Sequence, residues 1–259
     1  MPTTADFRRD PALPHLETRR ADNSRACYKP HSHPTFSIGA VDAGGSIFTG
    51  SGDTQARLAL GSLVLVPAGC VHACNPLPDM AWSYQMLHLD AQWLREHAPA
   101  LDGDTARVLD CPVLYAQFCA MNELLFSSRS AQEKDAALLA FLDACASATT
   151  EILPSVRKPI PLHLLPVADA LQAQPLATLQ QLAQSAGLSR FQLIRAFHAA
   201  TGMTPHAYQL NENVNRARSR LQAGTALAQL AHELGFADQS HFQRVFKAHA
   251  GITPGRYRS

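Results

Sequence analysis

The order of apolar and polar residues divides the chain into a strand-rich first part and a helical second part. Between Cys27 and about Leu89, short apolar or alternating runs predict strands at 36–41, 46–49, 55–60 and 62–66. Glycine-rich turns at 42–45 and 67–69 separate them. Many short strands with this spacing favour a small barrel or sandwich.

From about Val113 the apolar residues recur at helical spacing. One stripe consists of Leu114, Phe118, Met121 and Leu125, and a second of Leu138, Leu142 and Cys145. Such stripes belong either to the core or to a dimer interface. Residues 153–161 contain three prolines, which predicts a linker. We therefore expect a first domain at 1–153, a linker at 154–163 and a second domain at 164–259.

The second part of the chain contains the same unit twice. The matching residues lie 48 or 49 positions apart: Leu182 and Leu230, Gly187 and Gly235, Arg195 and Arg244, Phe197 and Phe246, Pro205 and Pro254, Tyr208 and Tyr257. Repeats of this kind indicate one supersecondary structure built twice.

Each unit has the pattern of two short helices joined by a tight turn. In the first unit, Thr178 with Gln181 predicts one helix start, and Ser189 with Gln192 predicts another. Gly187 ends the first helix, so the unit is a helix-turn-helix. In the second unit, Gly235 and Asp238 have the corresponding roles.

A long helix is predicted between the two units, from the cap Thr204 and Pro205 to Gly224. About 18 residues at 1.5 Å each span roughly 27 Å, which is close to one turn of DNA. The second helix of each unit would then enter the major groove, in successive segments.

Charge separates the two parts as well. The net charge is only +1, but residues 1–154 hold 11 Lys and Arg against 17 Asp and Glu, whereas residues 155–259 hold 11 against 4. A basic second half suits a polyanion such as DNA. One helix with an exposed polar face would be an ordinary solvated helix, but two in register in a basic domain favour DNA binding.

The stretch from Thr178 to Tyr257 resembles the DNA-binding region of the AraC/XylS transcriptional regulators, through residues 231–247 and the closing residues 251–254. The resemblance implies two helix-turn-helix subdomains on a linker helix, bound to promoter DNA. It assigns the DNA contacts to Arg190, Phe191, Gln192, Ile194, Arg195, Gln239, Ser240, His241, Gln243 and Arg244. Phe191 and Ile194 are apolar, which suits contact with thymine methyl groups.

The first part resembles, more weakly, the cupin-like effector domain of the same family. His31 and His33 fit the first cupin motif, but the acid expected at Ser37 or Ile38 is absent. Gly61, residues 67–69 and His72 fit the second motif, and residues 67–90 resemble the sensor half of other members. The resemblance implies an α+β chain, with a cupin-like β-barrel and helices before an all-α domain. It places effector binding at His31, His33, His72 and Tyr84.

Alternation along strands places His31 and His33 on one face, and Cys70, His72 and Cys74 on another. Imidazole and thiolate groups together could hold a late first-row divalent metal. The alternatives are an effector pocket, a plain barrel interior and a thiol redox sensor. The missing acid favours the pocket or the interior, so no cofactor is required on this view.

We expect a ligand-responsive, sequence-specific regulator rather than an enzyme. One rival is a metal-dependent cupin enzyme that carries a DNA-binding tail, and another is a non-specific nucleic-acid binder. Six cysteines without an export signal predict free thiols in a cytoplasmic protein. The expected partners are promoter double-stranded DNA, a small-molecule effector, a second copy of the chain and RNA polymerase, but no membrane. The effector, the promoter and the choice between activation and repression are left open.

Overall fold

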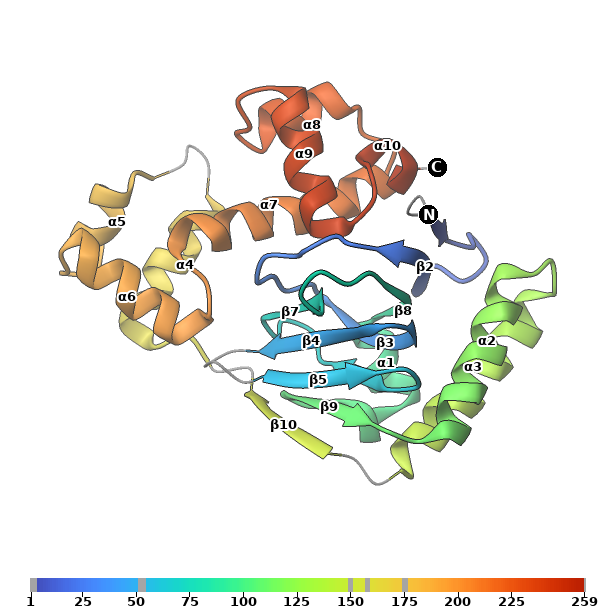
Figure 1. Cartoon of the computed structure of the whole chain (residues 1–259). Coiled ribbons are helices and arrows are strands. Elements are labelled where there is room, and N and C mark those ends of the chain that lie inside the picture. Colours follow the sequence, from blue (N-terminus) through green and yellow to red (C-terminus); the bar gives the residue numbers. More distant parts are fainter. Residues whose placement is uncertain (1–3, 51–54, 149–150, 157–158, 174–176, 259) are drawn as a thin grey trace. The chain divides into compact units, whose positions relative to one another are not determined.

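The computed structural model describes residues 4–50, 55–148, 151–156, 159–173 and 177–258, which Figure 1 colours along the chain. They form two compact units. The first comprises residues 1–27 and 33–157, and the second comprises residues 28–32 and 158–259. The α+β prediction is confirmed, because the first unit is rich in sheet and the second is helical. None of the described helices is long and apolar enough to cross a membrane.

Two antiparallel sheets make up the first unit. The larger has the order β1-β2-β8-β3-β6-β9-β10 and the smaller has the order β5-β4-β7. The strands of the larger sheet are β1 (Thr4–Arg8), β2 (Leu16–Ser24), β3 (Thr35–Ala43), β6 (Leu63–Val66), β8 (Trp82–Asp90), β9 (Thr105–Leu109) and β10 (Glu151–Val156). Those of the smaller sheet are β4 (Gly45–Gly50), β5 (Gln55–Ala59) and β7 (His72–Pro76).

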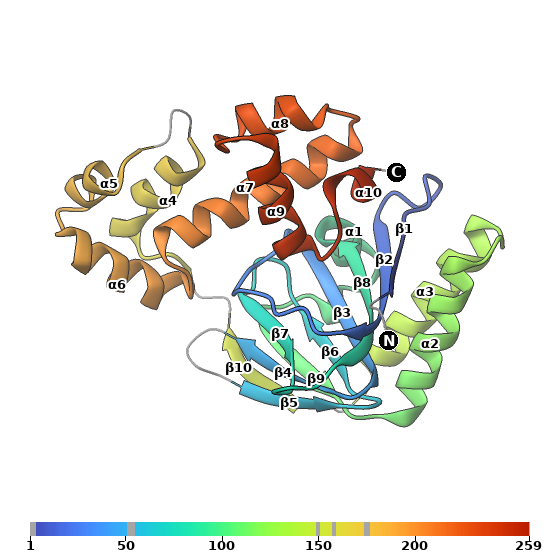
Figure 2. The same ribbon diagram turned by 45° about the horizontal axis from the view of Figure 1, so that its top comes forward.

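Both faces of the larger sheet are buried. Successive side chains of a strand point to opposite faces of the sheet, so one strand contributes residues to two cores. In β8, Leu87 and Leu89 belong to the core that the helices cover, whereas Trp82 and Tyr84 pack with Phe48 of the smaller sheet. The helices of this unit are α1 (Ala91–His97), η2 (Pro99–Leu101), α2 (Pro112–Phe126) and α3 (Ala131–Ala146). Figure 2 shows α2 and α3 side by side against the larger sheet.

The apolar stripes of α2 and α3 lie in the core of the chain. Leu114 and Phe118 of α2 and Leu138 and Leu142 of α3 are all buried in one cluster with Leu87. Of the two interpretations of these stripes, core packing is therefore the one the structure supports.

The four strands predicted from the sequence are all present, as β3 to β6. The sequence pattern gave no separate prediction for β1, β2, β8, β9 or β10. Residues 154–156 belong to β10, although the linker was expected to start at 154, and residues 157 and 158 of that linker lie outside the described residues.

An ion pair between the buried Lys134 and the half-buried Asp10 joins the beginning of the chain to α3. The Nζ atom of Lys134, whose side chain is only 2% exposed, donates to a carboxylate oxygen of Asp10 at 2.8 Å. This hydrogen bond, together with the backbone N–H of Ala12, lowers the pKa of Asp10 from its ordinary value of 3.8. A carboxyl group whose pKa is lowered by folding stabilises the fold above about pH 4, and the stabilisation is lost as the pH falls further.

Asp10→Ala should therefore lower the free energy of unfolding by about 3 kcal/mol at pH 7, because it leaves the Lys134 ammonium buried without its carboxylate. Urea titration followed by tryptophan fluorescence measures this directly, since Trp82 and Trp93, the only two tryptophans, both lie in the first unit. As a control, Asp10→Ala combined with Lys134→Met should recover most of the loss. An Asp10→Ala variant as stable as the parent at pH 7 would contradict this account.

From Leu162 to Arg258 the described part of the second unit is built from helices. Its helices are η3 (Leu162–Leu164), α4 (Leu165–Gln172), α5 (Leu179–Ser185), α6 (Arg190–Thr201), α7 (Pro205–Gln222), α8 (Leu227–Glu233), α9 (Gln239–Ala250) and α10 (Pro254–Arg258). The capping boxes predicted at Thr178 and Ser189 are present, with the side chains of Gln181 and Gln192 accepting in return.

Glycine makes the turn possible in each helix-turn-helix. Gly187 and Gly235 have φ angles of 64° and 72°, a left-handed conformation that residues with a side chain adopt at a cost. Asp238 caps α9 by accepting from the backbone N–H of His241 at 2.6 Å. The two predicted helix-turn-helix motifs are therefore confirmed as α5–α6 and α8–α9.

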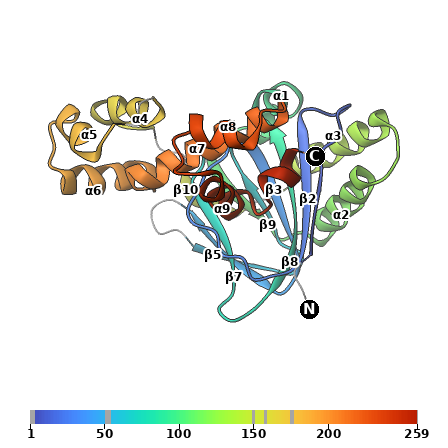
Figure 3. The same ribbon diagram turned by 90° about the horizontal axis from the view of Figure 1, so that it is seen from above.

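The 18-residue helix α7 connects the two motifs. Figures 1 and 3 show α4, α5 and α6 around its beginning and α8 and α9 beside its later part. Arg216 donates to the backbone carbonyl of Gln172 at 2.9 Å, and Arg220 pairs with Glu233 of α8. Two of the arginines on the polar side of α7 thus bind the helices on either side of it.

Candidate DNA-binding faces and sensor histidines

The outer face of α6 carries most of the residues expected to contact DNA in the first motif. Arg190, Gln192 and Arg195 are exposed, and Phe191 is 76% exposed, which is unusual for a large aromatic side chain. The side-chain oxygen of Gln192 also accepts from the backbone N–H of Ser189 at 2.9 Å. Its NH₂ group points away from that bond and can still donate.

Ile194 is the expected contact that lies differently. It is half-buried and lines a pocket between α6 and the start of α7. At 3.6 residues per turn, Phe191 and Ile194 lie between Arg190 and Arg195 around α6, so the face has an apolar centre with an arginine on each side. A face of this composition can donate to guanine and contact thymine methyl groups.

The corresponding face of α9 is more polar. Gln239, Ser240 and Arg244 are exposed, whereas His241 and Gln243 are half-buried. The imidazole of His241 meets the ring of Phe236 edge-on, with 5.5 Å between centroids, which restricts its orientation. Arg244 stands at the position in α9 that Arg195 has in α6, so each motif presents a guanidinium at the same place.

In the first unit, two of the predicted histidines meet in the interior. The rings of His33 and His72 are 4.9 Å apart, edge to face, and both are buried. The ring of His88 of β8 also lies 4.9 Å from that of His33, edge to face. The hydroxyl of Ser37 bridges Nδ1 of His33 at 3.1 Å and Nδ1 of His88 at 2.8 Å.

Hydrogen bonds fix the tautomer of two histidines. Nδ1 of His72 donates to the carbonyl of Cys70 at 3.0 Å, and Nδ1 of His31 donates to the carbonyl of Lys29 at 2.8 Å. A carbonyl only accepts, so Nδ1 carries the proton and Nε2 of the neutral ring carries the lone pair. His31 precedes His33 by two residues in the chain, but it belongs to the second unit.

Tyr84 lies away from the histidines on the same strand. It shares a face of β8 with His88, four residues on, which is roughly 13 Å along a strand. Its ring stacks on Trp82 with centroids 4.2 Å apart, and its hydroxyl accepts from Arg19. Tyr84 therefore lies on the side of the larger sheet that faces Phe48, apart from His88 along the strand.

Of the two cysteines expected near His72, Cys70 is buried and Cys74 is half-buried. Cys70 donates to the carbonyl of Asp104 at 3.4 Å, and desolvation raises the pKa of Cys74 to about 12. A thiol with this pKa is protonated at neutral pH, which makes it a slow redox group. None of the six cysteines, all of which lie among the described residues, forms a disulfide.

Sequence reasoning missed Ser37 and His88 as members of the cluster. Ser37 was noted only as a place where an acid was absent, yet its hydroxyl connects two histidines. His88 is paired with Ser37 where β8 lies beside β3. This pairing depends on the register of two strands that are far apart in sequence, so the sequence pattern alone did not reveal it.

A sheet-rich sensor unit followed by two helix-turn-helix motifs on one linker helix defines a DNA-binding transcriptional regulator. The family model described as "AraC-like ligand binding domain" matches residues 13–144, just over half of the chain, and the model described as "Helix-turn-helix domain" matches residues 182–259. The chain belongs to the AraC family of transcriptional regulators, with a ligand-binding domain and a helix-turn-helix DNA-binding domain.

Individual relatives agree with this assignment. The chain is 24% identical over 248 residues to the uncharacterized HTH-type transcriptional regulator YbfI of Bacillus subtilis (strain 168), covering 92% of this chain and 89% of that protein. It is 34% identical over 88 residues to the regulatory protein ada of Salmonella typhimurium, a local match over the helix-turn-helix region. That match covers 34% of this chain and 25% of ada, so the chain spans only a quarter of its length.

The fold also has a counterpart among solved structures. A crystal structure of apo ToxT from Vibrio cholerae strain SCE256 is similar with a TM-score of 0.55, at 14% identity, over 94% of this chain and 97% of ToxT. At this identity the similarity establishes the fold of the two domains.

Proposed function

We propose that this regulator recognises its promoter with α6 and α9, through exposed side chains at equivalent positions of the two motifs. The observation that carries the proposal is the pairing of Arg195 and Arg244, which are both exposed and belong to one repeat pattern. If these two positions only faced solvent, neutral or acidic residues would be equally suitable there. Arginine donates in a bidentate way to guanine in the major groove.

We further propose that the sensor binds its effector beside His33 and His72, and that binding there governs the response rather than the intrinsic DNA affinity. The supporting observation is a group of buried imidazoles and one hydroxyl between two sheets. Imidazoles titrate near neutrality and both donate and accept, which suits an anionic or hydrogen-bonding small molecule. In this proposal Tyr84 lines the space between the two sheets at a distance from the histidines.

A divalent metal is the second candidate for this place. The specific observation that favours it is the pair of buried rings of His33 and His72, whose centroids are 4.9 Å apart. The carbonyl bond to Nδ1 of His72 also resembles the bonds that orient metal-binding histidines. In the interpretation from the sequence, His31 would be the third ligand. Imidazoles suit a late first-row ion, although Ser37 supplies no charge where an acid would.

The His33→Ala, His72→Ala double variant tests both candidates. We expect it to bind promoter DNA within about threefold of the parent, because binding energy resides in the other unit, and to lose the response to the effector. A panel of anionic metabolites and anisotropy with labelled DNA measure the response, and elemental analysis measures the metal. Near-stoichiometric metal that disappears in the double variant would favour the ion. A double variant that still responds normally would show that these histidines are structural.

The remaining expectations complete the proposal. The protein acts in the cytoplasm, where its free thiols stay reduced. It binds DNA as a homodimer and contacts RNA polymerase when it activates transcription. We infer no catalytic step, which accords with its membership of a family of transcriptional regulators.

A further inference from the structure

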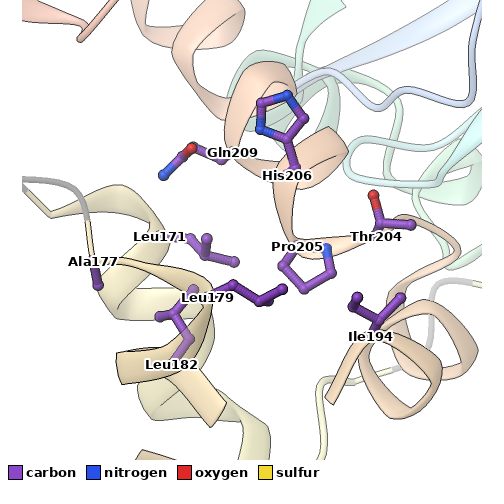
Figure 4. A pocket seen from close by; sticks show the side chains of 9 residues that line it. All are labelled: Leu171, Ala177, Leu179, Leu182, Ile194, Thr204, Pro205, His206 and Gln209. Atoms are coloured by element: carbon purple, nitrogen blue, oxygen red, sulfur yellow. The ribbon is translucent and has the colours of Figure 1, made fainter. Parts of the chain in front are cut away.

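The first helix-turn-helix motif contains a pocket of about 380 Å³. Pockets that hold small molecules start at about 300 Å³. Figure 4 shows the residues that line it, which come from α4, α5, α6, the beginning of α7 and the residues just before α5 and α7. These residues are Leu171, Ala177, Leu179, Leu182, Ile194, Thr204, Pro205, His206 and Gln209.

The lining is apolar on one side and polar on the other. Leu171, Leu182 and Ile194 supply the apolar wall from three different helices. His206 and Gln209 both belong to the beginning of α7, and Figure 4 shows them together on that helix. A few grouped polar side chains in an apolar wall are the composition of sites that orient a small ligand.

The internal repeat shows which of these residues the fold itself requires. Leu179, Leu182 and Pro205 have the same residues at the matching positions of the second motif, so they belong to the common core. The residues that match Ile194, His206 and Gln209 are Gln243, Gly255 and Arg258. The second motif folds with these replacements, so the fold itself does not require Ile194, His206 or Gln209.

We propose that this pocket is a binding site for a small, mainly apolar molecule with one hydrogen-bonding or anionic group. Its apolar body would lie against Leu171, Leu182 and Ile194, and its polar group would face His206 and Gln209. A partner helix, about 10 Å across with its side chains, is too large for this volume, so the occupant is a free small molecule.

Ligand binding in the pocket would change the affinity for DNA through Ile194. This residue lies on α6 between Phe191 and Arg195, so a ligand against it fixes the recognition helix relative to the start of α7. This second step rests on the proposed DNA-binding role of α6, whereas ligand binding itself does not. If α6 has two positions and the ligand binds one of them more tightly, the ligand favours that position. The change in DNA affinity is then limited by the ratio of the ligand's affinities for the two positions.

The test uses the full chain and 1-naphthylacetate, a probe with a two-ring apolar body and one carboxylate. Isothermal titration calorimetry should detect saturable binding of one probe per chain. Ile194→Gln, which introduces the residue of the second motif, should weaken binding by about tenfold, as expected when a wall group no longer matches the apolar body. Ala177→Phe, which adds a ring to the lining, should weaken probe binding similarly.

Two controls locate the site. Val245→Gln makes a comparable change at a half-buried position of α9 and should leave probe binding unchanged. The His33→Ala, His72→Ala variant should also bind the probe normally, because those histidines lie in the sensor unit. Circular dichroism of each variant confirms that the helices remain folded.

The proposal is overturned if the probe does not bind, or if Ile194→Gln and Ala177→Phe bind it as the parent does. DNA binding by the ligand-free protein is measured separately. A protein that binds promoter DNA but not the probe would retain the proposed function without this site. One that binds the probe in an Ile194-dependent way, but no DNA, would retain the site without the proposed function.

Discussion

Replacing Arg195 and Arg244 together by alanine is expected to weaken binding to the protein's own upstream DNA by about a hundredfold or more. A guanidinium that contacts a base edge contributes about 1–3 kcal/mol, and each 1.4 kcal/mol is a factor of ten. Both residues are exposed and occupy equivalent places on α6 and α9, so their losses should add. Fluorescence anisotropy with a labelled duplex measures the change.

The control is Arg258→Ala, which removes the same charge from α10. If net charge alone governed binding, this variant would weaken it as much as either single recognition-helix variant. A base contact should also relax the preference at one position of the site, whereas a phosphate contact should weaken all sequences about equally. An Arg195→Ala, Arg244→Ala protein with parental affinity would remove both faces from the interface.

The second large effect is expected from Phe246→Ala. The Phe246 ring is fully buried, 5.8 Å from the centroid of Phe242 and 5.4 Å from that of Tyr257. Removing such a ring costs about 3–5 kcal/mol, and a whole domain is typically stable by only about 5–15 kcal/mol. The variant should therefore unfold at much lower urea concentration, as followed by circular dichroism of the helices.

Phe246→Leu is the matched control, since it keeps an apolar side chain and should cost about 1 kcal/mol. The less stable variant should also bind DNA more weakly at low temperature, because α9 depends on this core for its position. If Phe246→Ala loses less than about 1 kcal/mol, the ring does not hold the second motif together, and our description of its core is wrong.

The helix-turn-helix motifs could be predicted from the sequence because their signals are local. Capping residues such as Ser189, the turn residues Gly187 and Gly235, and apolar residues at helical spacing lie within a few positions of one another. The repeat then doubled every signal. The pattern gave less guidance on Ile194, whose side chain lines a pocket built with residues of α4 and α7.

The sensor was predicted only in part, because its geometry depends on distant pairings. The strands from 36 to 66 follow one another and carry clear alternation, so they were found. The outer strands β1 and β10 are held by partners elsewhere in the chain, and the group of Ser37 with His88 depends on the β3 and β8 register. Tyr84 was grouped with the histidines by resemblance, but the direction and length of β8 separate them.

The central claim is that the chain recognises a particular DNA sequence with its two motifs. The most direct test compares its affinity for its own upstream DNA with that for random duplex DNA across a salt series. We expect tighter binding to the upstream DNA at every salt concentration, with both affinities falling at least tenfold between about 50 and 200 mM salt. Equal affinities for the two DNAs, or binding that does not depend on salt, would contradict the account.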